Sequence, residues 1–215
     1  MLKLRVRTFV AILVPALSLQ MATAQIPQLT PFSSDVQVTS GRGASGTHDV
    51  TGKVYVNREH MRMDMNATAG GAIMITTFAT KTSDLLMPEQ HMYMEFNANQ
   101  AMARRPGVAT NIKPFTDPSN PCANEAGATC KNLGVEEVNG RAADHWRITD
   151  KNGKVSNTWI DQKLHFPIKS VTEETTFQLT NIKEGDQPAS LFAIPPGYQK
   201  MDLGQMMQGM RPPQQ

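Results

Sequence analysis

Hydrophobic and polar residues alternate with a period of two along most of this chain. In residues 50–56 every second position is apolar, and in 60–65 the methionines Met61, Met63 and Met65 alternate with polar residues. Successive side chains of a strand point to opposite faces, so the alternation predicts half-buried β-strands. The pattern recurs in residues 72–77, 85–87, 92–96, 133–138, 142–149, 155–160, 167–171 and 175–182. We expect nine or ten strands in an antiparallel meander.

Short turns join these segments, whereas helical signals are few. Asn139-Gly140 is the strongest hairpin signal, because both residues accept the positive φ angles of a tight turn, and Asn152-Gly153 is a second. Helix formers gather only in residues 97–104, before Pro106, and in residues 202–210. The sequence predicts a mainly β fold with a few short helices, whose large sheet is covered or curls on itself.

The N-terminus has the pattern of a cleaved secretion signal. Lys3, Arg5 and Arg7 precede an apolar run over residues 9–19, and Ala22-Thr23-Ala24 is a cleavage site of the small-x-small type. The run is shorter than the roughly 20 residues that span a bilayer, so we expect membrane contact to be peripheral only. The predicted organisation is a signal peptide (1–24), a flexible segment (25–34), a single β domain (35–203) and a flexible Gln/Met/Pro tail (204–215).

Removal of this signal changes the charge balance. The whole chain has 21 basic and 19 acidic residues, but three of the basic residues lie within the first seven positions. The remainder is therefore close to neutral. It has no basic run with interleaved aromatic residues, so we do not expect a nucleic-acid partner.

Several motifs resemble a known superfamily. W-I-D…P-I-K occurs at 159–169 and L-F-A-I-P-P-G-Y at 191–198, and G-K-V-Y-V at 52–56 precedes Met61-Arg62-Met63-Asp64. With the hairpin segment 134–146, these motifs resemble the LolA-like periplasmic lipoprotein-carrier superfamily, in an uncharacterised secreted bacterial branch. The resemblance implies a strongly curved half-barrel capped by a few helices, in a periplasmic or secreted protein. It does not imply a particular ligand.

Cys122 and Cys130 are the two cysteines of the chain, and they flank a loop rich in Pro, Asn and Gly. In an oxidising compartment, two nearby cysteines most often form a disulfide. Closing so short a loop adds about 2–3 kcal/mol of stability on the chain-entropy model. We expect this disulfide rather than a metal site, because the loop contains no histidine.

Catalytic motifs are missing from the sequence. There is no G-x-S-x-G nucleophile motif and no H-x-x-x-H metal pair. The acidic pairs Glu136-Glu137 and Glu173-Glu174 are adjacent, so within a strand they point to opposite faces. We therefore expect no enzyme and no cofactor.

The methionines of residues 61–65 and 92–94 allow three interpretations. With His60 and His91 they could hold Cu(I), since thioether and imidazole are soft ligands. They could instead form a deformable surface for acyl chains, or ordinary core packing. Alternation places each histidine on the face opposite its methionines, and copper also requires the two segments to be neighbours. We therefore expect no metal.

The favoured hypothesis is a non-enzymatic periplasmic domain that binds a hydrophobic ligand, a lipid or a lipoprotein acyl chain, in a curved sheet. Arg62 is the candidate for steering a headgroup, and its alternative role is an ion pair with Asp64. The second hypothesis is an envelope structural or interaction module without a small ligand, whose tail docks a partner. The candidate lining residues of the first hypothesis are Val54, Val56, Met61, Met63, Met65, Met74, Met92, Met94 and Phe96.

Overall fold

A single twisted sheet dominates the computed structural model, which describes residues 29–41, 48–66, 71–97, 120–123 and 125–201. Its twelve strands lie in the order β12-β6-β5-β4-β3-β2-β1-β11-β10-β9-β8-β7. All neighbouring pairs are antiparallel except β12 with β6. The mainly β, antiparallel fold predicted from the alternation is confirmed.

Most strands pair with their neighbours in the chain, and the exceptions are the β1–β11 and β6–β12 pairs. Two short 3-10 helices, η1 (Pro88–Gln90) and η2 (Ala189–Phe192), interrupt the succession. The strands are β1 (Phe32–Ser40), β2 (His48–Val56), β3 (His60–Asn66), β4 (Ala72–Thr77), β5 (Thr82–Met87), β6 (Met92–Asn97), β7 (Thr129–Val138), β8 (Arg141–Thr149), β9 (Val155–Asp161), β10 (Phe166–Val171), β11 (Thr175–Glu184) and β12 (Gln199–Lys200).

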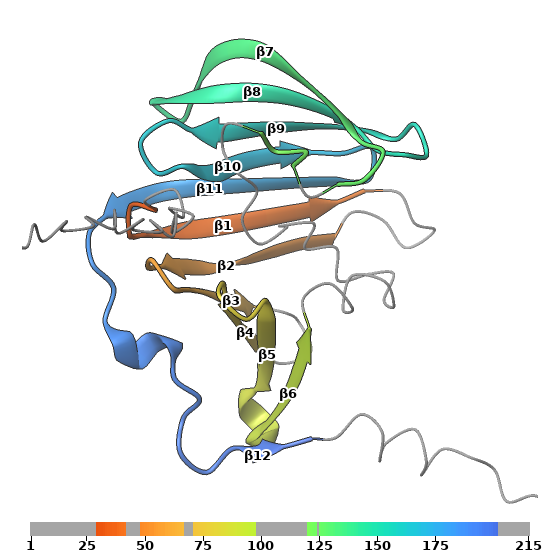
Figure 1. Ribbon diagram of the computed structural model, residues 1–215. Helices are drawn as coiled ribbons and strands as arrows, with labels where there is room; N and C mark the ends of the chain where they lie inside the picture. The colour runs from red at the N-terminus through yellow and green to blue at the C-terminus, as the bar shows by residue number, and fades with distance from the viewer. Residues whose placement is uncertain (1–28, 42–47, 67–70, 98–119, 124, 202–215) are drawn as a thin grey trace, which may run out of the picture.

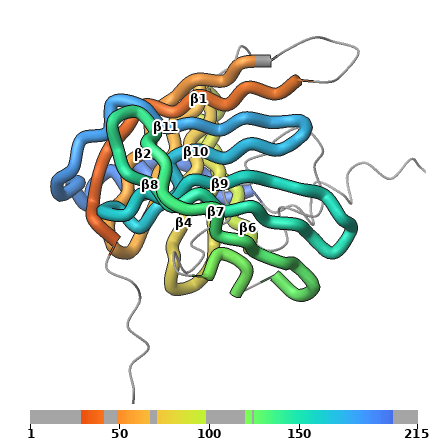
Figure 2. The backbone as a smooth tube through the Cα atoms, turned by 90° about the horizontal axis from the view of Figure 1, so that it is seen from above, coloured from red at the N-terminus to blue at the C-terminus, as the bar shows by residue number. Residues whose placement is uncertain are grey.

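The sheet is open and strongly curved. Figure 1 shows β7 to β11, β1 and β2 stacked one above another, and β3 to β6 turning steeply away from them. Figure 2 looks along this stack, and there β4 and β6 cross the direction of β9 and β10. Gly52 lies where β2 meets the turning part of the sheet. A Cβ atom at this position would lie 1.9 Å from the carbonyl oxygen of Asp64, so the close approach of β2 and β3 requires glycine.

The predicted hairpin between β7 and β8 is present. Asn139 and Gly140 have φ angles of 51° and 76°, as a two-residue turn of this hand requires. The β8–β9 connection differs, because Gly153 has a positive φ angle whereas Asn152 does not. There the Asp150 carboxylate accepts the backbone N–H groups of Asn152 and Lys154 and stabilises a wider loop.

The N-terminal end of the described chain differs from the sequence prediction. Leu29 is buried, and β1 begins at Phe32, inside the segment 25–34 that was predicted to be flexible. The polar residues Ser33, Ser34 and Asp35 obscured the alternation of this strand. The predicted signal peptide, the tail 204–215 and both predicted helices (97–104 and 202–210) lie almost wholly outside the described residues. Over the part of the chain that the structure describes, no helix reaches the length and hydrophobicity that a membrane crossing requires.

The hydrophobic core joins the two ends of the meander. Phe32 in β1 packs edge-on against Phe166 in β10, with ring centroids 5.2 Å apart. Around them lie buried residues from strands that are distant in sequence, among them Val54, Met63 and Leu179. Burial of these side chains against each other, rather than local propensity, fixes the pairing of β1 with β11.

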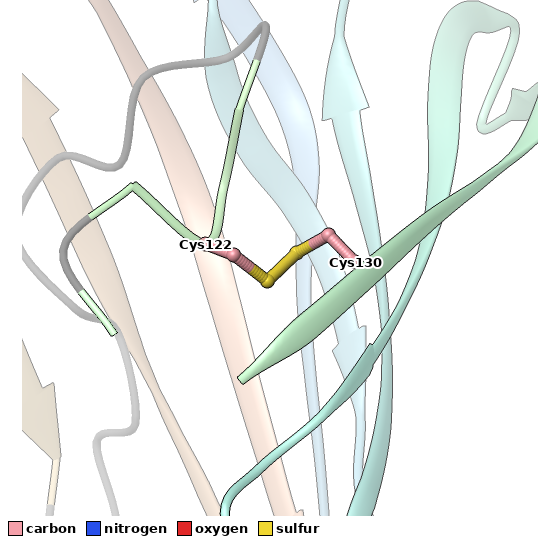
Figure 3. The surroundings of a disulfide bond; sticks show 2 residues. All are labelled: Cys122 and Cys130. Carbon is pink, nitrogen blue, oxygen red and sulfur yellow. A yellow bond between two sulfur atoms is a disulfide. The ribbon is translucent and has the colours of Figure 1, made fainter. Parts of the chain in front are cut away.

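The predicted disulfide between Cys122 and Cys130 is confirmed. It links the segment before β7 to the second residue of that strand, as Figure 3 shows. The Cα atoms of the two cysteines lie 5.9 Å apart, which is the usual separation for a disulfide.

Candidate ligand-binding face

The strand register brings all nine candidate lining residues onto one face of the sheet. Val54, Met63 and Met74 lie directly opposite one another on β2, β3 and β4, and this row continues through Leu85 to Met94. A second, parallel row contains Thr76 and Ser83 between Met61 and Phe96. We call these side chains the Met face: Val54, Val56, Met61, Met63, Met65, Met74, Thr76, Ser83, Leu85, Met92, Met94 and Phe96.

Burial is most complete on the β2–β3 part of the Met face and is uneven on β4 to β6. Val54, Val56, Met61 and Met63 are buried, with at most 2 % of each residue exposed. The half-buried members are Met65 on β3, Met74 on β4, Leu85 on β5, and Met92 and Phe96 on β6, whereas Met94 on β6 is buried. The valines of β2 are stiff, whereas methionine has three rotatable side-chain bonds and adapts to irregular shapes. The Met face therefore changes from a rigid core into a deformable apolar surface.

Three hydroxyl groups interrupt the apolar character of this side of the sheet. Thr76 and Ser83 are buried and hydrogen-bond to each other at 2.8 Å. Ser34 in β1 lies opposite Val54, and its buried Oγ has no hydrogen-bond partner. Ser34 also sits where the pairing of β1 with β11 shifts register, between Ser33 and Asp35. Sequence reasoning missed these hydroxyls because isolated Ser and Thr residues are common in strands.

Arg62, the predicted headgroup residue, lies on the opposite face of β3. Its Nε and Nη2 atoms donate to the two carboxylate oxygens of Asp64, at 2.5 and 3.1 Å. Its Nη1 donates to the carbonyl oxygen of Leu191 at 2.8 Å. The side chain is 15 % exposed. Arg62 thus clamps the C-terminal segment to β3, and its predicted ion pair with Asp64 is present.

We call residues 185–201 the strap, because this segment runs along the turned part of the sheet (Figure 1). The ring of Phe192 stacks on His60, with centroids 5.5 Å apart. Further along, the backbone N–H groups of Gln199 and Met201 donate to the carbonyl oxygens of His91 and Tyr93, both at 2.8 Å. These contacts make β12 the edge strand beside β6.

Asp84 in β5 lies on the same face as Arg62. It is placed between Ile75 and Glu95 across the strands, and its Oδ1 is buried without a hydrogen-bond partner. Burial raises the pKa of Asp84, nearby Glu95 raises it further, and Lys200 of the strap opposes the shift.

The copper hypothesis required the segments containing Met61 and Met92 to be neighbours. They are not, because β4 and β5 separate β3 from β6. His60 stacks on Phe192, and His91 lies 5.7 Å from the ring of Tyr198, so neither imidazole faces the methionine rows. Among the described residues, no group of three or more His, Cys, Asp or Glu side chains is arranged to hold a metal ion.

A polar network that sequence reasoning missed lies over β7 to β10. Glu136 accepts the indole N–H of Trp159 at 2.7 Å and approaches Nδ1 of His145 at 2.8 Å. The imidazole stacks on Trp159 at 4.3 Å, and Nζ of Lys169 in β10 lies 4.6 Å from the centroid of the Trp159 ring. The indole and imidazole groups hold the pKa of Glu136 below its ordinary value. Nε2 of His145 lies 3.0 Å from Oδ1 of Asn157, so both ring nitrogens of this imidazole have partners within the fold.

A second charged cluster stabilises the end of the β9–β10 hairpin. Arg141 forms a two-point ion pair with buried Asp161 and also donates to Glu184. Asp161 accepts the backbone N–H groups of Lys163 and Leu164, which fixes the turn between the strands. Each charged group has a partner within the fold, so this cluster is a structural feature.

Comparison with solved structures supports the fold. The chain is similar to an uncharacterized conserved protein from Thermus thermophilus, with 12% identity, a TM-score of 0.51, and coverage of 80% of this chain and 90% of that chain. A second similar structure is a Pseudomonas aeruginosa MucA/MucB complex, with 17% identity, a TM-score of 0.48, and coverage of 77% of this chain and 56% of that chain. A third is a LolA superfamily protein from Nitrosomonas europaea, with 10% identity, a TM-score of 0.40, and coverage of 78% of this chain and 91% of that chain.

Sequence comparison gives a family without a function. No curated protein matches the chain significantly. The family model described as "Domain of unknown function (DUF4412)" matches residues 42–165, which is more than half of the chain. The chain therefore belongs to the DUF4412 family.

Proposed function

We propose that this domain is a non-enzymatic binding protein of the bacterial envelope, and that it holds a flexible hydrophobic ligand, a lipid or a lipoprotein acyl chain, on the Met face. The observation that carries the proposal is the change of the Met face from fully buried Val54 and Met63 to half-buried Met74, Met92 and Phe96. An acyl chain requires a deformable apolar surface on a rigid base, and half-buried methionines beside a buried core supply such a surface.

An extracytoplasmic location supports the same proposal. The Cys122–Cys130 disulfide persists in oxidising compartments and is rare in the cytosol. The secretion signal predicted for residues 1–24 would deliver the chain to such a compartment. Carrier function requires no catalytic group, and the contacts of His145 and Glu136 give these side chains a structural role.

Two of the earlier hypotheses do not involve the Met face. The headgroup role of Arg62 stays a prediction, and the contacts of its guanidinium with Asp64 and Leu191 favour a role in holding the strap. The interaction module with a docking tail depends on residues 204–215, which lie outside the described residues.

Native mass spectrometry of the protein, purified without detergent from cells that secrete it, tests the proposal. We expect lipid to co-purify with the protein. An environment-sensitive acyl probe should bind at least about tenfold more weakly to the variants Met74→Asp and Met92→Asp, because burying an unpaired carboxylate under the ligand costs free energy. Thr77→Asp places the same charge on the opposite face of β4 and is the matched control. Circular dichroism checks that each variant is folded, and Met74→Ala serves if the charged variants are not. Absence of lipid together with no probe binding would refute the proposal.

A further inference from the structure

Hydroxyl groups that lack acceptors lie within the apolar side of β1 to β6. Ser34 Oγ is buried, with 5 % of the residue exposed, and has no hydrogen-bond partner. Thr76 and Ser83 are 2 % and 3 % exposed and share one hydrogen bond. Two hydroxyls carry two O–H donors, and their mutual bond uses only one of them. Among the described residues, this side of the sheet therefore offers two unused donors, one near β1 and one between β4 and β5.

Charged groups are confined to the other side of these strands. The residues that share a face with Met63 are uncharged in β1, in β2 from Val50 onward, and in β3 to β6. They are Phe, Val, Met, Leu, Ala, Gly, Ser and Thr. The charged side chains of the same strands, such as Lys53, Arg62 and Glu95, alternate onto the opposite face. An ionised ligand group buried on the Met face would find no counter-charge there, and burying an unpaired carboxylate costs far more than burying a neutral ester.

We infer that the ligand is a neutral acyl ester or amide rather than a free fatty acid, and that its carbonyl oxygen accepts a hydrogen bond from the Thr76–Ser83 pair, with Ser34 as the second donor. This inference rests on the proposed function. A carbonyl group is an acceptor without a proton to donate, so it complements an O–H donor that has no acceptor of its own.

The location of the Thr76–Ser83 pair suits this role. It lies between Met61 and Phe96 in its cross-strand row, where the Met face changes from buried to half-buried side chains. Ser34 lies three strands from β4, which corresponds to about 14 Å at the usual strand spacing. The residues between the two donors include the buried Met61 and Met63, so an acyl chain anchored at the Thr76–Ser83 pair extends over the half-buried methionines Met74 and Met92.

Three probes with the same labelled chain test the inference at pH 8: an NBD-labelled stearic acid, its methyl ester, and the corresponding hydrocarbon without a carbonyl group. We expect the ester to bind at least about tenfold more tightly than the ionised acid. The double variant Thr76→Val/Ser83→Ala should weaken binding of the ester about 3–10-fold and leave binding of the hydrocarbon unchanged, because only the ester loses a hydrogen bond. Ser34→Ala should show the same selectivity with a smaller loss.

Stability separates this role from a purely structural one. Removing a buried hydroxyl that lacks an acceptor should leave the melting temperature of the ligand-free protein unchanged or raise it, whereas a structural hydroxyl would lower it. Thr77→Val, on the opposite face of β4, is the control for β-branched substitution. Equal binding of acid and ester, or unchanged ester binding in the double variant, overturns the inference and leaves the proposed function standing. If none of the three probes binds, the proposed function fails as well.

Discussion

Met63 on β3 lies directly opposite Met74 on β4, yet Met63 is fully buried and Met74 is not. Their side chains share a face, so the difference in burial does not come from the alternation of the strands. The buried core draws on β1 to β3 and β7 to β11, and Met74 packs against it as a partly buried residue at the border with the part of the Met face on β4 to β6. The two methionines therefore have different roles, and substitutions can separate them.

Met63→Ala should lower the free energy of unfolding by about 2–5 kcal/mol, because it leaves a cavity in the core. Met74→Ala should cost less than about 1.5 kcal/mol, since its half-exposed site relaxes more readily. Urea unfolding followed by tryptophan fluorescence measures both values. Equal losses would show that Met74 is also a core residue, and would weaken the proposed binding surface.

Gly52→Ala should destabilise the protein by at least about 2 kcal/mol, because the new Cβ would collide with the backbone of Asp64 and force β2 and β3 apart. Gly41→Ala is a matched control: no atom lies within 4 Å of the position of its Cβ, so we expect a change within about 0.5 kcal/mol. Comparable unfolding midpoints of the two variants in urea would contradict the close approach described for β2 and β3.

Arg62→Ala should release the strap, because the guanidinium provides the hydrogen bond to the Leu191 carbonyl. Hydrogen exchange read by NMR should then speed up at the amides of Gln199 and Met201, which donate to the carbonyl oxygens of His91 and Tyr93. Amides in the β1–β2 ladder should keep their protection. If the strap amides stay protected while an anionic lipid probe binds less tightly, Arg62 has the headgroup role instead.

Asp84→Asn should raise the melting temperature at pH 7. The pKa of Asp84 in the folded state lies above its ordinary value of 3.8, so the protonated form favours folding. That contribution is fully present below pH 3.8 and is lost as the pH rises through the folded-state pKa. Wild type and variant should therefore differ at pH 7 and converge near pH 3 in thermal scans. A lower melting temperature for the variant at pH 7 would show that the carboxylate has a stabilising partner.

The alternation of apolar and polar residues was sufficient to assign side chains to the two faces of the sheet, but not to identify which strands are neighbours. It placed Met61, Met63 and Met65 on one side and Arg62 on the other, because the alternation of a strand is a local property. It could not show that β4 and β5 separate the two methionine segments, or that β1 pairs with β11 more than a hundred residues away. Such pairings depend on which apolar surfaces are buried together, and this is decided by the whole chain.

The strap and the buried hydroxyls were unpredictable for different reasons. The two residues of β12 are too few to show a period, and they pair with β6, which lies about a hundred residues earlier in the chain. Ser34, Thr76 and Ser83 are common residue types in strands, and their significance appears only when burial and missing partners are known. By contrast, the Asn139-Gly140 turn and the Cys122–Cys130 disulfide are short-range features, which the sequence alone was able to predict.

Photo-crosslinking with an acyl ester that carries a diazirine in its chain tests the central proposal most directly. The probe is bound to the purified protein, irradiated, and located by peptide mass spectrometry. The account predicts saturable labelling within β3 to β6, at Met-face residues such as Met74 and Met92, and competition by the unlabelled ester. Labelling confined to the surroundings of Trp159 on β9, or labelling that neither saturates nor responds to competitor, would contradict it.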